Sequence, residues 1–133
     1  MFLVNALSTK VLFNAGATHS FINPTTAKQM ACTAEEMDMH LYVSTPIGSI
    51  YQTDLVVRNC TITIRDRVFF ADLAVLSIQR YDVILGMDWL TKYQATIDCK
   101  QKTLALVTSE RENLVFKGGS PNHIIPLISA TIA

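Results

Sequence analysis

The sequence predicts an all-β domain, and three observations lead to this prediction. Short apolar segments, several with alternating polar and apolar residues as in Thr61–Ile64, recur along most of the chain. Turn residues separate these segments at short intervals, which favours a barrel or a sandwich over a βαβ fold. Helical patterns are confined to two short segments, after Asn23 and after Gly86. A length of 133 residues is typical of one domain.

In the first part of the chain we expect a strand over residues 2–5, a turn over 6–9 and a strand over 10–13, followed by a tight loop over 14–18 and a short strand at 21–22. A short helix is expected from Pro24 to Met30, because Asn23 suits the N-cap and proline suits the first helical position. Glu35 and Glu36 are expected to form a solvated connection.

From Met37 to Ile78 the pattern is β, with strands over 50–57, 61–64 and 68–76 and a hairpin turn over 45–49. A buried strand is expected over 81–86, one or two helical turns over 87–93, and a final hairpin from 95–99 and 103–107. Residues 1–117 then form the domain. Residues 118–133 are a linker or the start of a following segment, and their apolar end could add a strand or cover a sheet edge.

Charge and composition argue against several classes of function. The chain has 11 basic and 11 acidic residues and a formal net charge of zero. We therefore expect no nucleic-acid partner, since binding of phosphates needs a basic face. We also expect no membrane partner, since the chain has neither a basic cluster nor an apolar span of about 20 residues. The three cysteines are widely spaced and indicate neither disulfides nor a zinc site. His40 and His123 have no partner at ligand spacing, so we expect no metal and no cofactor.

The segment Val11–Ser20 carries the most chemical information. It reads as an apolar strand that leads a polar residue, Asn14, into a tight turn at Gly16. Taken alone, it is equally well explained as an ordinary turn. A weaker echo of the same pattern, an apolar strand that ends in a glycine turn and a helix, occurs at Val83–Gly86.

With its context, Val11–Ser20 resembles the active-site loop of aspartic proteases, in which two apolar residues precede Asp-Thr/Ser-Gly. Ile84-Leu85-Gly86, about 70 residues later, resembles the second diagnostic segment, and the turn at 45–49 lies where that family has its flap. Three segments are most similar in sequence to the protease domain of plant Ty3/gypsy-type retrotransposon polyproteins: Phe13–Ile22, Val43–Pro46 and Tyr81–Leu90. The resemblance covers residues 2–117.

This resemblance implies a small closed barrel of the retropepsin type with one or two short helices, and an active site at the two-fold axis of a homodimer. It implies catalytic positions at Asn14, Gly16 and Thr18. The substrate implied is an extended peptide of the polyprotein, and the residues implied to contact it are Ala17, Pro46, Ile47, Gly48 and Ile84. Thr18 is similar to a residue whose hydroxyl supports the catalytic group. A turn hydroxyl that bonds its own backbone is the alternative.

Two positions depart from the family pattern: Asn14 stands in place of the catalytic aspartate, and Ala15 in place of Ser or Thr. Aspartic proteolysis needs two carboxyls that share one proton, one to take a proton from water and one to donate a proton to the peptide carbonyl. An amide does neither, so the chain as written is expected to be inactive. We favour an engineered change at Asn14 over a natural pseudoenzyme. Ala15 lacks the hydroxyl that ties the subunits together, which weakens the dimer by about 0.5–1.5 kcal/mol per bond.

Other residues have simpler explanations. A Ser20–His19 catalytic pair is less plausible than a structural histidine, because adjacent residues on a strand point apart. Asp88 is expected to cap the helix that begins at Met87 rather than to bond across a dimer. Trp89 and Tyr93, four residues apart, are expected to pack together in the core.

The function implied is an aspartic endopeptidase that processes its polyprotein in the cytoplasm or within virus-like particles. The alternatives are a non-catalytic peptide-binding or dimerisation module on the same fold, and an unrelated β-barrel.

Overall fold

The computed structural model describes residues 2–5, 7–14, 16–30, 33–44, 50–64, 67–78, 81–98, 100–101, 103–108, 110–117 and 129–132. Within these ranges the chain is mostly β, with short helices at α1 (Pro24–Gln29) and α2 (Met87–Lys92). The all-β prediction is therefore confirmed at this level. Both helices lie within one residue of their predicted ends, and Asn23 caps α1 by accepting a hydrogen bond from Thr25 N.

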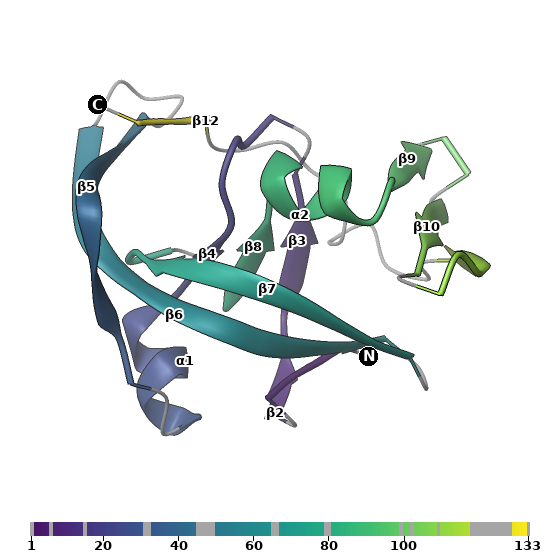
Figure 1. Ribbon diagram of the computed structural model, residues 1–133, viewed down its shortest axis with the longest axis horizontal. Helices are drawn as coiled ribbons and strands as arrows, with labels where there is room; N and C mark the ends of the chain where they lie inside the picture. The colour runs from purple at the N-terminus through teal and green to yellow at the C-terminus, as the bar shows by residue number, and fades with distance from the viewer. Residues whose placement is uncertain are drawn as a thin grey trace.

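The framework is a long, curved hairpin of β6 (Ile50–Ile64) and β7 (Arg67–Val75), which crosses the molecule in Figure 1. The strand order of the main sheet is β12-β5-β6-β7-β4-β8-β3. The other strands on this path are β5 (Glu35–Ser44), β4 (Phe21–Ile22), β8 (Val83–Leu85), β3 (Val11–Phe13) and β12 (Ser129–Ile132). The sheet has two further strands off the path: β1 (Phe2–Val4) pairs with β6, and β2 (Leu7–Thr9) pairs with β1. Among the described residues this order is an open path, so closure of the sheet into a barrel stays a prediction.

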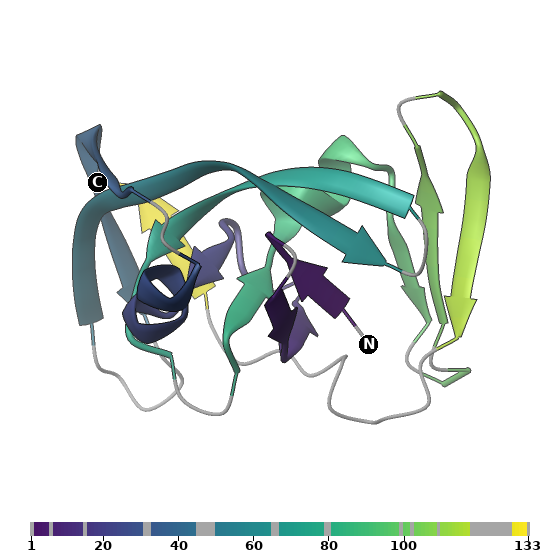
Figure 2. The same cartoon turned by 90° about the horizontal axis from the view of Figure 1, so that it is seen from below.

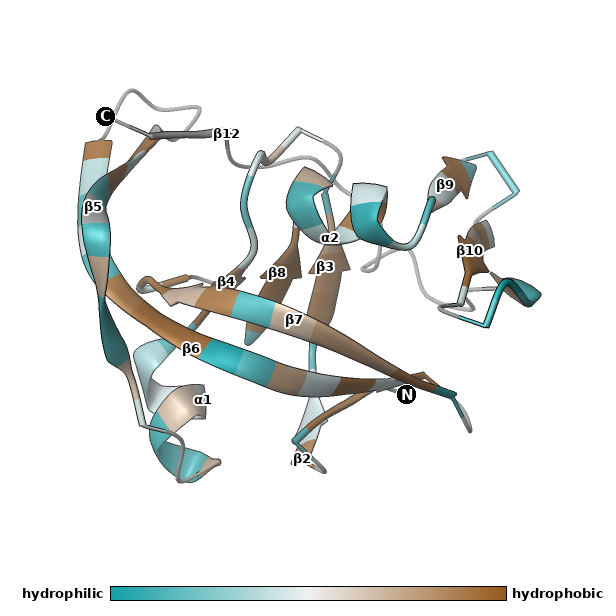
Figure 3. Ribbon diagram, viewed as in Figure 1, coloured by the Kyte–Doolittle hydropathy of each residue, from teal (hydrophilic) through white to brown (hydrophobic). Residues whose placement is uncertain are grey.

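Two neighbouring strands, β3 and β8, are buried on both faces. They pair in parallel, with Val11 opposite Val83 and Phe13 opposite Leu85. Phe13 and Leu85 point into the larger core cluster, whereas Leu12 and Ile84 point into the smaller one. Strands buried on both faces need continuous apolar sequence, and Figure 3 shows β3 coloured hydrophobic along its length. The echo seen in the sequence thus corresponds to two neighbouring strands.

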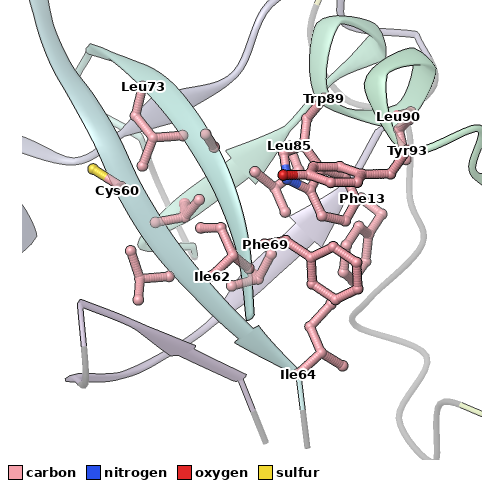
Figure 4. Packing of buried hydrophobic residues seen from close by; sticks show 14 of the residues in the cluster. Phe13, Cys60, Ile62, Ile64, Phe69, Leu73, Leu85, Trp89, Leu90 and Tyr93 are labelled. Atoms are coloured by element: carbon pink, nitrogen blue, oxygen red, sulfur yellow. The ribbon is translucent and has the colours of Figure 1, made fainter. Parts of the chain in front are cut away.

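The larger core is organised around four aromatic rings between α2 and the β6–β7 hairpin (Figure 4). The Trp89 ring lies 5.2 Å from the Tyr93 ring, 5.8 Å from Phe69 and 5.7 Å from Phe13, measured between centroids. The Tyr93 hydroxyl also accepts a hydrogen bond from Phe70 N at 2.7 Å, which attaches the end of α2 to β7. The predicted packing of Trp89 against Tyr93 is confirmed.

A second sheet lies at the end of the molecule away from β5 and β12 (Figures 1 and 2). It has the order β11-β10-β9, formed by β9 (Thr96–Asp98), β10 (Thr103–Val107) and β11 (Asn113–Lys117). The hairpin of β9 and β10 agrees with the sequence prediction. Strand β11 was not predicted, because a polar segment precedes it, yet Leu114 and Phe116 point toward the core while Val115 is 65% exposed.

The N-terminal region departs from the prediction. Residues 6–9 were expected to form a turn, but β2 (Leu7–Thr9) pairs with β1 (Phe2–Val4) in a hairpin. The turn instead falls at Asn5, whose φ is 47°. Asparagine tolerates this left-handed conformation better than most residues, which allows so tight a reversal.

Two predictions for the central hairpin were also wrong. Glu35 and Glu36 are not a connection but the start of β5, paired with Val56 and Leu55 while their side chains stay exposed. The two strands predicted over 50–57 and 61–64 are one strand, β6. A register shift between Val57 and Cys60 and a φ of 54° at Asn59 let β6 continue through a segment that resembles a turn.

The final residues form an edge strand. Strand β12 pairs antiparallel with the end of β5, which is one of the roles considered for the apolar segment. The domain boundary at residue 117 stays a prediction. The predicted turn at 45–49 lies outside the described residues, although Ser44 and Ile50 on either side of it are paired.

Candidate active site

Asn14 follows β3 directly and lies at the start of the loop singled out in the sequence. Its backbone N–H donates to Leu85 O at 2.9 Å, which extends the β3–β8 pairing by one residue. Its side-chain Oδ1 accepts a hydrogen bond from Gly16 N at 2.8 Å, and its backbone carbonyl accepts one from Ala17 N at 3.1 Å. The residue is fully buried in the single chain. The loop therefore holds one polar group at residue 14 in a fixed orientation.

The start of α2 lies directly against this loop. Met87 N donates to Ala17 O at 2.7 Å, and Asp88 N donates to Thr18 O at 3.2 Å. These are the first N–H groups of the helix, which have no partner within the helix itself. The loop carbonyls thus act as the cap of α2, while the helix fixes the path of the loop.

Ser20 completes this attachment with its side chain. Its hydroxyl accepts a hydrogen bond from Gly86 N at 3.0 Å and donates one to Asp88 Oδ1 at 2.6 Å. Asp88 Oδ1 lies 2.7 Å from Trp89 N, which donates to it, so the carboxylate also serves the first turn of α2. Asp88 was expected to cap this helix, but the N-cap is Gly86, the helix has no side-chain cap, and Asp88 lies within the first turn. The link to Ser20 was not anticipated.

We expect Ser20→Ala to lower the free energy of unfolding by about 1–3 kcal/mol, because the buried Gly86 N–H loses its acceptor and Asp88 loses a donor. Chemical denaturation monitored by Trp89 fluorescence measures this change. Ser8→Ala is the matched control, since Ser8 is exposed on β2. A loss in Ser20→Ala no greater than in Ser8→Ala would contradict the proposed link.

The structure brings several of the predicted site residues together. Asn14, Gly16 and Ala17 form one hydrogen-bonded turn beside Leu85 and Met87. Thr18 is exposed, and its Oγ1 lies 2.9 Å from His19 Nδ1. Ile84 and Ala17 are fully buried in the smaller core cluster of this single chain. Ala15, Pro46, Ile47 and Gly48 lie outside the described residues.

The remaining chemistry of the described part is sparse. The Cys60 thiol is buried and donates to Val57 O at 3.8 Å, and His40 Nδ1 lies 2.9 Å from Gln52 Nε2. The described residues contain no group of three or more His, Cys, Asp or Glu side chains arranged to hold a metal ion. None of the described helices is long and apolar enough to cross a membrane.

The arrangement around Asn14 is suited to hold a carboxylate. A backbone N–H is directed at one side-chain oxygen, and such a bond stabilises the ionised form of an acid at the same position. With asparagine, the oxygen faces Gly16 N because only that atom of the amide accepts hydrogen bonds. The amide can hold a water molecule but has no basic oxygen to deprotonate it.

Comparisons with known proteins identify the family and the fold. A family model described as retroviral aspartyl protease matches residues 1–112. The chain therefore belongs to the retroviral aspartyl protease family. Among solved structures, the retroviral protease-like domain of Ddi1 from Leishmania major has a similar fold, with a TM-score of 0.58 and 19% sequence identity. The match covers 86% of this chain and 88% of that one. The curated proteins include no match.

Proposed function

We propose that this chain is the protease domain of a retrotransposon polyprotein of the plant Ty3/gypsy type, in a form that Asn14 makes inactive. The observation that carries the proposal is the environment of Asn14 described above: a fully buried side chain, directly after β3, whose oxygen accepts the Gly16 N–H. Its activity would be endoproteolysis of extended segments of its own polyprotein, in the cytoplasm or within virus-like particles.

The proposed enzyme is a homodimer, as in other members of this family. The described chain supplies one loop of the required kind, and a pair of carboxyls needs two. Asn14 has no exposed surface in the single chain, although Gly16 and Thr18 of the same loop are exposed, so contact between two copies of the Asn14 side chain requires its surroundings to rearrange. Sedimentation over a concentration series is expected to show a monomer–dimer equilibrium. A monomer at every concentration would contradict the dimer.

The decisive experiment restores the acid with Asn14→Asp and measures cleavage of peptides taken from the polyprotein. Cleavage by this variant, abolished by an inhibitor of aspartic proteases, is expected. A folded, dimeric Asn14→Asp chain that cleaves no peptide would contradict the enzyme proposal.

That negative result would favour a second candidate, a peptide-binding or dimerisation module on the protease fold. The identity of residue 14 is the observation that favours it, because an amide in this position retains the hydrogen bond to Gly16 while removing the acid and the base.

A further inference from the structure

A cavity of about 170 Å³ lies between α2 and the edge of β7. Strand β4 pairs with β7 only at Ala74 and Val75, so among the described residues no strand pairs with residues 67–73 on that side. The helix covers this edge instead, through the hydrogen bond from Phe70 N to the Tyr93 hydroxyl (Figure 4). Because single side chains join the helix to the edge, in place of a backbone ladder, space remains between them.

Two carboxylates line the cavity, Asp72 from β7 and Asp88 from α2. Asp88 Oδ1 accepts hydrogen bonds from Ser20 Oγ and Trp89 N, whereas Asp88 Oδ2 has neither a hydrogen bond nor an ion pair with a described residue. Asp72 forms an ion pair with Arg58 at 3.7 Å, but both side chains are about half exposed, so the pair is weak. Both carboxylates can therefore accept further hydrogen bonds.

Lys92 also lines the cavity, but its charge is directed elsewhere. Its Nζ donates to Phe70 O at 3.4 Å and lies 5.3 Å from the centre of the Tyr93 ring. Within the described part of the chain, no ion pair joins Lys92 to Asp72 or Asp88. The cavity thus has two carboxylates and one ammonium group that does not pair with them, which favours a ligand with positive charge.

The size and the apolar lining of the cavity indicate which cation fits. A volume of about 170 Å³ has room for roughly six water molecules, which exceeds a lone ammonium group and suits a guanidinium with its adjoining methylenes. The Phe70 ring lines the cavity and is 45% exposed. A guanidinium stacks on such a ring while its N–H groups bond carboxylates. Val68, on the same face of β7, is 54% exposed and offers an apolar contact next to Phe70.

We propose that the cavity between α2 and β7 binds an arginine side chain of a partner protein, in a segment where an apolar residue stands next to the arginine. The guanidinium bonds to Asp72 and Asp88 Oδ2 and stacks on Phe70, and the apolar neighbour packs on Val68. This inference goes beyond the proposed function because it requires neither cleavage nor a dimer. It is tested on the chain with Asn14 as it stands, so its failure is separate from a failure of Asn14→Asp to cleave.

The test titrates the unchanged chain with the dipeptide acetyl-Leu-Arg-amide. Trp89 is the single tryptophan and lines the cavity, so its fluorescence reports occupancy. We expect saturable binding with a dissociation constant of about 1 mM or below. Acetyl-Leu-citrulline-amide, which has the same shape without the charge, should bind at least about fivefold more weakly. The arginine peptide should also raise the thermal midpoint of unfolding, because it binds the folded chain alone.

Variants of the two carboxylates locate the binding. Asp88→Asn removes the charge but keeps an oxygen that accepts from Ser20 and Trp89. Asp72→Asn likewise keeps an acceptor for a backbone N–H. Each variant should weaken binding about fivefold or more. Asp54→Asn is the matched control, because it removes an exposed carboxylate of β6 that does not line the cavity, and it should bind like the unchanged chain.

Arg58 provides a test with the opposite sign. Its guanidinium competes with the ligand for Asp72, so Arg58→Gln should bind the arginine peptide about two- to threefold more tightly. Weaker binding by Arg58→Gln would show that Arg58 supports the ligand site, contrary to the proposal.

Four further results would overturn the proposal. The first is no saturable change in Trp89 fluorescence together with an unchanged midpoint, and the second is equal affinity for the arginine and citrulline peptides. The third is binding by Asp72→Asn and Asp88→Asn as tight as binding by Asp54→Asn; if Asp88→Asn does not fold, Asp72→Asn alone decides. The fourth is binding of methylguanidinium as tight as that of acetyl-Leu-Arg-amide, because a partner segment must contribute more than the charged group.

Discussion

Asn14→Asp is expected to raise the rate of peptide cleavage by at least about 10⁴-fold over the unchanged chain. General acid–base catalysis contributes about 10²–10⁴, and the asparagine form lacks both the acid and the base. The substitution exchanges an amide for a carboxyl of nearly the same size. The hydrogen bond from Gly16 N, at 2.8 Å in the present chain, can be retained by a carboxylate oxygen. The fold should therefore change little, while residue 14 gains a group that can act as an acid and a base.

The pH profile tests the same prediction in a second way. Two carboxyls that share one proton work only in the singly protonated state, so activity should fall both in stronger acid and as the pH rises. A bell-shaped profile of kcat/KM in the acidic range is expected. Asn14→Ala is the matched control and should remain inactive at every pH, because alanine also lacks a titratable group. Cleavage by Asn14→Ala equal to that by Asn14→Asp would contradict a role for residue 14.

Local signals in the sequence were sufficient where structure depends on neighbouring residues. The Asn23-Pro24 pair locates the start of α1, since a side-chain cap and a fixed φ act within one turn. The uninterrupted apolar residues of β3 and β8 likewise predict strands buried on both faces. The loop at residue 14 was found because its residue pattern resembles that of a known family of proteases.

The signals failed where the outcome depends on distant pairing. Ser20 and Asp88 are 68 positions apart, and their hydrogen bond exists because β8, which leads to α2, lies between β3 and β4, and Ser20 directly precedes β4. The echo between Val11–Gly16 and Val83–Gly86 hints at that neighbourhood but does not identify the pair. At Asn59 the sequence indicated a break between two strands, whereas the structure has one continuous strand with a bulge. Asp72 Oδ1, on the neighbouring strand, accepts a hydrogen bond from Asn59 N at 2.9 Å and supports this bulge.

The described contacts suggest that residue 14 is held mainly by packing of backbone against backbone. Ala17 O and Thr18 O accept the first N–H groups of α2, and Ser20 bonds Gly86 N. Gly86 lies at the centre of this contact. Its missing side chain allows the loop and the start of the helix to approach closely, as glycine does where two backbones meet. A side-chain atom added at Gly86 should therefore displace both the loop and the start of α2.

Gly86→Ala is accordingly expected to lower the free energy of unfolding by about 3 kcal/mol or more. A Cβ at this position would lie 2.2 Å from His19 O and 2.7 Å from Ala17 O, both of which are backbone atoms. Ala17 O cannot withdraw without losing its hydrogen bond from Met87 N. Since Gly86 has a φ of −99° and a ψ of −163°, alanine can adopt the same extended conformation, and the cost is steric.

Chemical denaturation of Gly86→Ala beside Met87→Ala measures this cost. Met87 is the next residue, 40% exposed at the start of α2, and its truncation is expected to cost less than about 1 kcal/mol. In the Asn14→Asp background, Gly86→Ala should also abolish cleavage, because the loop that carries residue 14 is displaced with the helix. If Gly86→Ala were as stable as Met87→Ala and left that cleavage intact, the loop and α2 could not be in the close backbone contact on which the geometry of residue 14 depends.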